Sequence, residues 1–134
     1  MKRILLATDF SDSSAHALRV AASLARDLGA KIQVVHVLAL HDADPVTAER
    51  KLPDFVPADL EGLVESSKII RATTAEHGVI HEAREQNADL IVIGTHGHTG
   101  LSHVLLGSVA ERVVRLADRP VLTVRPPAEL IKDP

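Results

Sequence analysis

Residues 89–109 read DLIVIGTHGHTGLSHVLLGSV, the stretch with the clearest structural pattern in the chain. An apolar run, Leu90–Ile93, is followed by glycines at positions 94, 97, 100 and 107, and a helical pattern begins at Ser108. This order predicts a buried strand, a glycine-rich loop and the N-terminus of a helix. Backbone N–H groups of such a loop can converge on an anion, with the positive end of the helix dipole behind them. We therefore predict that this stretch holds the phosphates of a nucleotide.

Two explanations of the glycines remain open at this point. A turn between a strand and a helix needs small residues in any case, which is a purely structural explanation. The segment from Gly94 to Gly107 is, however, longer than the roughly two to six residues of a typical connection, and long loops at this position often carry function. The GxxxxGK[ST] motif of P-loop proteins is absent, and no GxGxxG motif follows the first predicted strand.

The composition excludes several classes of protein. A chain of 134 residues predicts one domain, and its net charge of −3 leaves no strongly basic surface for nucleic acid or an anionic membrane. Two Phe and no Tyr or Trp also argue against a binder of single-stranded nucleic acid. The absence of Cys excludes disulfides and thiol catalysis. The apolar run near the N-terminus is too short for a signal peptide or a membrane span, so we expect a cytoplasmic protein.

Strand-like and helix-like segments alternate along the chain. The strands are predicted at Ile4–Thr8, Ile32–Leu38, Lys68–Thr73, Asp89–Gly94 and Val121–Val124. The helices are predicted from a cap at Ser11 or Asp12 to Gly29, with Leu28 facing inward, then at Ala58–Ser66, at Ala75–Gln86 and at Ser108–Ala117, with Leu116 facing inward. The segment His41–Pro57 is predicted as a surface excursion with a turn or two of helix around Val46–Lys51. The alternation predicts an α/β fold whose mostly parallel sheet is covered on both faces and binds ligands beyond the C-terminal strand ends.

Two further groups of polar residues follow from the sequence. Asp9 ends the first strand, where its carboxylate can cap the following helix or accept hydrogen bonds from a ribose or a base. His96 and His98 alternate in the glycine loop, and His103 lies near them, but two or three such side chains are weak evidence for a zinc site, so no metal site is predicted. No Ser, His and Asp set marks a catalytic triad.

The glycine spacing resembles that of a known family. Gly94-Thr-His-Gly97, nine further residues and Gly107-Ser108 have the G-x-x-G-(nine)-G-[ST] form of the universal stress proteins. The opening ILLATDFSDSSAHALRVAASLARDLGAKIQVVHV and the segments ADLIVIGTHG and RPVLTVRP are also similar to that family. The resemblance implies a three-layer, Rossmann-like fold of the adenine nucleotide alpha hydrolase type, with five parallel strands in the order 3-2-1-4-5. We expect a single domain over residues 1–126 and a C-terminal tail over 127–134.

The resemblance also implies a ligand and a partner. Family members with the intact motif bind ATP, so ATP, ADP or AMP is the expected ligand. A homodimer is implied through the fifth strand, Val121–Val124. Transferred residue by residue, the family's nucleotide contacts are Ala7, Thr8 and Asp9 for adenine and ribose, Val37 for the base, Ile93, Gly94 and Gly97 for the ribose and phosphate path, and Gly107, Ser108 and Val109 for the phosphates.

One position departs from the family pattern. Many members have Arg or Lys directly after the second glycine, whereas this chain has His98, and there is no Lys or Arg between Gly94 and Ser108. Histidine is mostly neutral at pH 7. We therefore expect Mg²⁺ to balance the charge of a triphosphate, and we include His98 among the predicted nucleotide-binding residues.

Three functions remain in order of preference. The first is an ATP-binding stress-response or regulatory module with slow or no hydrolysis, because nothing in the sequence marks a catalytic base. The second is an ATPase or a phosphoryl or nucleotidyl transferase that uses the same pocket. The third is an interaction module without a nucleotide, and the sequence names no protein partner for any of the three.

Overall fold

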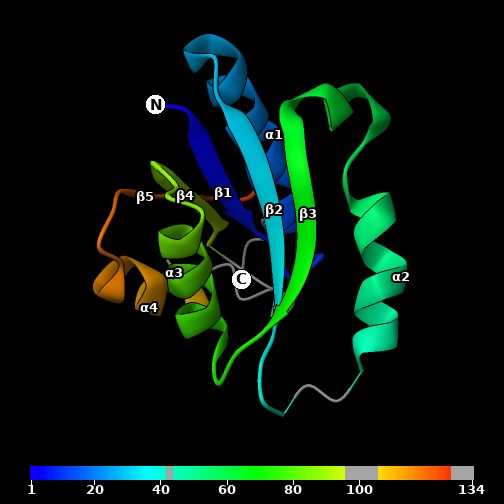
Figure 1. Ribbon diagram of the computed structural model, residues 1–134, viewed down its shortest axis with the longest axis vertical. Coiled ribbons are helices and arrows are strands. Elements are labelled where there is room, and N and C mark those ends of the chain that lie inside the picture. The colour runs from blue at the N-terminus through cyan, green and yellow to red at the C-terminus, as the bar shows by residue number, and fades with distance from the viewer. Residues whose placement is uncertain (42–43, 96–105, 128–134) are drawn as a thin grey trace.

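A computed structural model of the chain describes residues 1–41, 44–95 and 106–127. Its five strands are parallel and form one sheet in the order β3-β2-β1-β4-β5, which confirms the order implied by the resemblance (Figure 1). In chain order, the strands β1 to β5 span Arg3–Ala7, Lys31–Leu38, Val64–Arg71, Leu90–Gly94 and Val121–Val124. The helices α1 to α4 span Asp12–Leu28, Pro45–Phe55, Ala75–Glu85 and Ser108–Leu116, and a 3₁₀ helix, η1, covers Ala58–Leu63.

The sheet is the middle layer of three. Side chains alternate between the two faces of a strand, so each strand contributes to two cores. On one face, Leu6 of β1 packs in a cluster with α1 residues and with Leu52 of α2. On the other face, Leu5 of β1 packs with Val79 of α3 and Val113 of α4. The three-layer α/β architecture expected from the sequence is therefore confirmed.

The centre of the sheet is also where its winding reverses. β1 pairs with β2 on one side and with β4 on the other, in registers that include Leu6 opposite Val34 and Leu6 opposite Val92. From β1 the chain builds outward to β3, and from β4 it builds in the opposite direction to β5. In parallel α/β sheets, ligands bind at such a reversal, beyond the C-terminal ends of the strands.

The segment between β2 and α3 differs from the sequence prediction. α2 is a full helix of 11 residues, because Asp44 caps it by accepting the N–H of Thr47, Pro45 suits its first turn, and Leu52 is buried against the core. Pro53 lies inside this helix and does not end it. Tertiary packing therefore outweighs the helix-breaking signal of the proline.

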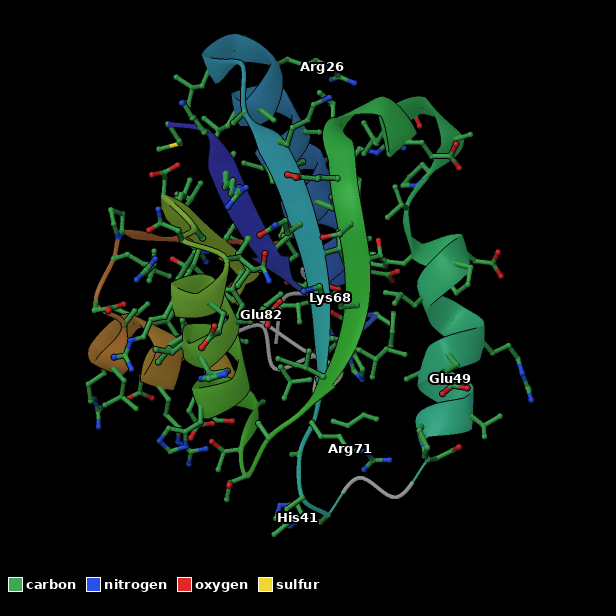
Figure 2. The ribbon with its side chains drawn as sticks, in the orientation of Figure 1. Arg26, His41, Glu49, Lys68, Arg71 and Glu82 are labelled. Carbon is green, nitrogen blue, oxygen red and sulfur yellow. The ribbon has the colours of Figure 1, made fainter. Side chains whose placement is uncertain are left out.

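The third strand is longer than predicted and begins earlier. Val64–Ser66, predicted as the end of a helix, belongs to β3, and the helical structure before it is only the 3₁₀ helix η1. Ser66 and Ser67 pair with Gln33 and Val34 of β2, so backbone pairing forms a strand from residues with little strand signal of their own. Lys68 of β3 also forms an ion pair with Glu82 of α3 at 3.0 Å, which ties this edge strand to the helix layer (Figure 2).

The ends of α1 are as predicted, but two expected core residues are not buried. Ser11 caps α1 by accepting the N–H of Ser14, and Gly29 follows its end with φ of 66°. Leu28 and Leu116 are both about half exposed, at 49% and 48%, so the prediction that they face inward is wrong. In α4 the buried stripe runs through Ala110 and Val113 and continues to Ala117, and Leu116 lies about 100° around the helix from Ala117.

Other sequence-based expectations are not settled by the fold. β5 lies at the edge of the sheet, and no strand of the described residues pairs with its outer side, but the homodimer through Val121–Val124 stays a prediction. The boundary between a domain ending at residue 126 and a tail also stays a prediction. Within the described ranges, no helix is both long enough and apolar enough to cross a membrane.

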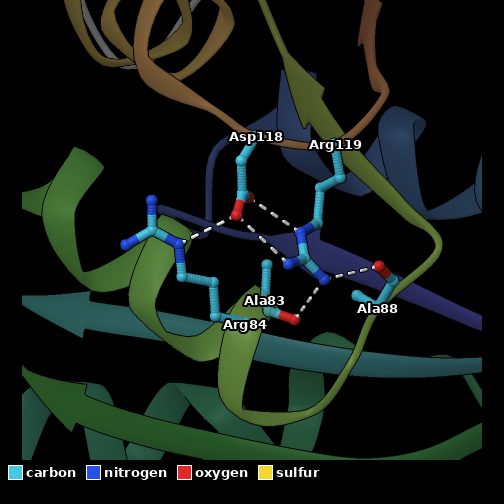
Figure 3. A network of polar contacts seen from close by, with 5 residues as sticks. All are labelled: Ala83, Arg84, Ala88, Asp118 and Arg119. Atoms are coloured by element: carbon cyan, nitrogen blue, oxygen red, sulfur yellow. Dashed lines mark hydrogen bonds and ion pairs between the residues drawn. The ribbon is translucent and has the colours of Figure 1, made fainter.

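A polar network fastens the turn before β5 to the end of α3. Arg119 donates from Nη1 to the carbonyl oxygens of Ala83 and Ala88, both at 2.9 Å, and from Nε to Asp118 at 3.0 Å (Figure 3). Arg84 of α3 donates to the other carboxylate oxygen of Asp118 at 3.0 Å. The hydrogen bonds from Arg119 and then from Arg84 lower the pKa of Asp118 from 3.8 to about 2.

The network predicts a pH-dependent loss of stability. A carboxyl group whose pKa is lower in the folded chain stabilises the fold above its unfolded pKa, and this contribution disappears as the group is protonated. Asp118→Asn should therefore lower the free energy of unfolding at pH 7. The difference in this free energy between the variant and the unmodified chain should become smaller as the pH falls from about 4 towards 2. Urea unfolding of both proteins at several pH values measures this difference. Asp27→Asn, at an exposed position of α1, is the matched control. The prediction would be contradicted if Asp118→Asn lowered the free energy of unfolding by the same amount at pH 7 and at pH 2.

Candidate functional site

A pocket of about 220 Å³ opens at the C-terminal edge of the sheet, where the winding reverses. Its lining comes from the ends of β1, β2 and β4 and from the starts of α1, α3 and α4. Each of the predicted site residues that the structure describes lines this pocket: Ala7, Thr8, Asp9, Val37, Ile93, Gly94, Gly107, Ser108 and Val109. The predicted residues Gly97 and His98, and also His96 and His103, lie outside the described residues.

The floor of the pocket is apolar. Ala7, Val35 and Ile93 come from three adjacent strands and belong to the core cluster between the sheet and α3 and α4. Val79 of α3 belongs to the same cluster and lines the same pocket. This surface can accept a planar apolar group such as a nucleobase, although no aromatic side chain is among the residues that form it.

The end of β1 is shaped by a local hydrogen-bond network. The Thr8 hydroxyl accepts the N–H of Phe10 and shares a hydrogen bond with the Ser14 hydroxyl, both at 2.8 Å. Asp9 accepts the N–H of Ser11 at 3.0 Å, which is the turn that leads into α1. Phe10 has φ of 65°, a conformation that costs energy for a residue with a side chain. The network therefore holds the chain in a tight turn that keeps Asp9 at the rim of the pocket.

Phe10 is held from outside the turn by two further rings. The centroid of its ring lies 4.4 Å from that of the His36 ring on β2, and 5.9 Å from that of the Phe55 ring on α2, which it meets edge-on. The His36 Nδ1 also lies 2.7 Å from the carbonyl oxygen of Thr8. Because a carbonyl oxygen can only accept, Nδ1 carries the proton in this contact. Phe10 therefore packs with rings from β2 and α2.

Gly94 is needed where α1 crosses the end of β4. A Cβ atom at this position would lie 2.5 Å from the Ser13 Oγ and 3.1 Å from the Ser13 carbonyl carbon and oxygen. A Cβ atom this close to the Ser13 Oγ would require that side chain to move, and the backbone contacts at 3.1 Å would require α1 to shift by a few tenths of an ångström. The first glycine of the motif therefore has a packing role in addition to its place in the pocket wall.

A second close approach places α3 against the pocket. Gly78, an unexpected residue in the first turn of a helix, lies where a Cβ atom would come within 2.6 Å of Val37 Cγ1 and 3.0 Å of Ala72 Cβ. The missing side chain allows α3 to pack directly on Val37, one of the predicted site residues. The reason for a glycine at this helical position is visible only in the contact between α3 and β2.

The start of α4 presents backbone donors to the pocket. Gly107 is the N-cap, and having no side chain it makes no side-chain cap, so the N–H groups of Ser108, Val109 and Ala110 are not capped by it. The N–H of Gly107 donates to the carbonyl oxygen of Thr95, which fixes the helix end against the end of β4. The three residues that follow Gly107 all line the pocket. A helix N-terminus of this kind attracts an anion.

The charged groups around the pocket are few. Among the described residues that line it, Asp9 is the one carboxylate, and there is no Lys or Arg. Arg112, one turn into α4, is exposed and is not part of the lining. Within the described ranges, no three or more His, Asp or Glu side chains gather as a metal site. The described part of the lining therefore offers an anion mainly backbone dipoles and hydroxyl groups.

Comparison with known proteins identifies the family. The sequence model of the universal stress protein family matches residues 1–125. The chain belongs to the universal stress protein family. It is 35% identical to universal stress protein MJ0531 of Methanocaldococcus jannaschii, over 94% of this chain and 83% of that protein. It is 30% identical to universal stress protein YxiE of Bacillus subtilis, over 92% of this chain and 98% of that protein.

Solved structures of universal stress proteins share the fold. The structure of MJ0577 from M. jannaschii has a TM-score of 0.79 and 26% identity to this chain, over 92% of this chain and 95% of that one. The universal stress protein of Archaeoglobus fulgidus in complex with dAMP has a TM-score of 0.72 and 26% identity, over 92% of this chain and 98% of that one. One of these relatives was thus solved with an adenine nucleotide bound.

Several residues of the universal stress protein pocket were not found from the sequence. Ser14 carries no local signal because its partner, Thr8, lies outside α1, and Thr95 carries none because it stands between a strand and a glycine-rich segment as a single polar residue. The remaining missed residues lie at helix starts and on β2, where the sequence shows a capping residue, positions of an apolar stripe, or, for His36, one polar side chain within a buried strand. They are Ser11, Val35, His36, Ala75, Val79 and Ala110.

Proposed function

We propose that this universal stress protein binds an adenine nucleotide in the pocket at the reversal of the sheet and acts as a nucleotide-dependent stress-response or regulatory module. One observation carries the proposal. One pocket combines an apolar floor with the N-terminus of α4, whose N-cap makes no side-chain hydrogen bond. The predicted contacts of base, ribose and phosphate that the structure describes line this same pocket. The relative from A. fulgidus solved with dAMP supports the choice of an adenine nucleotide.

The parts of the pocket suggest how the ligand lies. The base would rest on the apolar floor near Val37, and Asp9 at the rim would accept hydrogen bonds from the ribose. The phosphates would lie at the start of α4, where the N–H groups of Ser108 and Val109 are available as donors. Hydrolysis is proposed to be slow or absent, because Asp9, the carboxylate of the described lining, accepts the N–H of Ser11 and serves the turn into α1.

The proposal is tested on the freshly purified protein. Mass spectrometry of the small molecules released by denaturation should identify AMP, ADP or ATP, and the same nucleotides should raise the melting temperature of the emptied protein. A protein that releases no nucleotide and shows no shift with any of the three would contradict the proposal. Phosphate release measured with bound ATP separates a binding module from an ATPase.

The charge of the pocket predicts a different need for Mg²⁺ among nucleotides. The carboxylate of Asp9 and the hydroxyl of Ser108 are oxygen donors of the kind that Mg²⁺ accepts, together with phosphate oxygens. Because no Lys or Arg is part of the described lining, removal of Mg²⁺ should weaken ATP binding by roughly tenfold or more, while AMP binding changes much less. Titration calorimetry with and without EDTA measures both. Equal affinities for ATP in the two conditions would show that another group balances the charge.

A further inference from the structure

Thr95 lies where β4, β5 and α4 meet. Its N–H donates to the carbonyl oxygen of Val124 at 3.0 Å, so the strand pairing of β4 with β5 continues one residue past Gly94. Its own carbonyl oxygen accepts the N–H of Gly107, the N-cap of α4. Both backbone groups of Thr95 are therefore used by the fold, and the side chain is what remains to be explained.

The hydroxyl of Thr95 is buried without a partner. The residue is 2% exposed, and its Oγ1 has no hydrogen-bond partner within the part of the chain that the structure describes. Burying a hydroxyl without a hydrogen bond destabilises a fold, so such a group needs an explanation. The other pocket threonine, Thr8, differs in this respect, because its hydroxyl already bonds Ser14 and Phe10.

The position of this hydroxyl points to a ligand. Side chains alternate along a strand, which places Thr95 on the same face as Ile93, the face covered by α3 and α4. Thr95 also lines the pocket. The second unpartnered buried atom of the described chain, the Gln33 Oε1, is not comparable, because Gln33 is not among the lining residues.

The neighbouring groups decide what kind of ligand atom the hydroxyl meets. The backbone hydrogen bond from the Gly107 N–H to the Thr95 carbonyl oxygen joins Thr95 to the N-cap of α4, and Thr95 lines the same pocket as the first three residues of that helix. An atom placed among the N–H groups of that first turn is an acceptor with negative charge. A hydroxyl can donate to the same atom, since its hydrogen rotates freely.

We propose that the Thr95 hydroxyl donates a hydrogen bond to a phosphate oxygen of the bound nucleotide, and that this contact makes the pocket prefer nucleotides to nucleosides. The inference rests on the proposed function, since it names one group of the same site. The buried hydroxyl is a cost to the empty protein that the ligand relieves. Thr95 is thus a specificity-determining residue, and removal of its hydroxyl has opposite effects on binding and on the stability of the empty protein.

The test compares matched substitutions in the full chain. Thr95→Val replaces the hydroxyl by a methyl group at nearly constant shape, and Thr95→Ser keeps the hydroxyl. Thr123→Val is the control, because Thr123 is a half-buried threonine on β5 that does not line the pocket. For each protein, calorimetry gives the dissociation constants of AMP and adenosine, and thermal unfolding gives the melting temperature of the nucleotide-free form.

The expected result separates phosphate recognition from a structural role. Thr95→Val should weaken AMP binding by roughly tenfold, weaken adenosine binding by less than about twofold, and leave the melting temperature of the empty protein equal or higher. Thr95→Ser and Thr123→Val should bind AMP nearly as the unmodified chain does.

Three outcomes would overturn the inference while leaving nucleotide binding intact. These are unchanged AMP binding by Thr95→Val, an equal loss for AMP and adenosine, and a clear fall in the melting temperature of the empty variant. Failure of the unmodified chain to bind AMP, ADP or ATP would instead overturn the proposed function. In that case, comparing the melting temperatures of Thr95→Val and the unmodified chain still shows whether the hydroxyl stabilises the fold.

Discussion

Gly94→Ala should destabilise the protein and weaken nucleotide binding together, even though it adds a single methyl group. The added Cβ would lie 2.5 Å from the Ser13 Oγ and 3.1 Å from the Ser13 backbone, so the Ser13 side chain must move and the first turn of α1 must shift by a few tenths of an ångström. Overpacking of this kind costs about 1–3 kcal/mol, which exceeds the roughly 0.5–1 kcal/mol that Ala gains over Gly in a strand. Urea unfolding measures the stability, and calorimetry with AMP measures the binding.

The two effects share one cause. Ser13 belongs to the first turn of α1, which follows directly on the turn that holds Asp9 at the rim of the pocket. Displacement of that turn moves the carboxylate from its place opposite the start of α4, so we expect a loss of roughly tenfold in AMP affinity. Nucleotide binding would in this way report how closely α1 packs on β4.

Two further variants make the Gly94 prediction specific. Gly62→Ala is the matched control, because a Cβ atom at Gly62 would have no atom within 4 Å. Ser13→Ala removes the nearest clashing atom but leaves the backbone contacts, so it should restore only part of the stability lost in Gly94→Ala. If Gly94→Ala were as stable as Gly62→Ala, the close approach of α1 to β4 would be refuted.

Gly107→Asp should abolish nucleotide binding without lowering stability. Gly107 has φ of −67° and ψ of 163°, which is the ordinary backbone conformation of an N-cap residue. An Asp there can accept the N–H groups of Val109 or Ala110, and its charge interacts favourably with the helix dipole by about 0.3–1 kcal/mol. The free energy of unfolding should therefore stay equal or rise.

The same carboxylate competes with the ligand. It takes the donors that are proposed to hold the phosphates, and it places a negative charge against them. Like charges that face each other cost several kcal/mol, so the affinity for AMP should fall by roughly 100-fold or more. Gly107→Asn separates the two causes, because it caps the helix without a charge and should lose less affinity. Retention of AMP binding by Gly107→Asp would show that the phosphates lie elsewhere.

Much of the candidate site could be predicted because its residues follow strands directly. The C-terminal ends of parallel strands lie at one edge of the sheet, so Asp9, two positions after β1, and Gly94, the last residue of β4, could both be placed at that edge from the sequence. The glycine spacing then selected the family, which the match over residues 1–125 confirms. The edge strand β3 was harder, because its polar residues are held by pairing with β2 and carry little strand signal of their own.

The sequence by itself determined the order of strands and helices along the chain and the ends of α1. These features depend on local periodicity, on capping residues and on glycines at fixed spacing, all of which act between near neighbours in the chain. The tertiary structure decided why Gly94 and Gly78 must lack side chains and why Thr95 keeps a hydroxyl that no described residue binds. Those facts arise where elements distant in sequence come within van der Waals contact, and no local pattern records the distance between them.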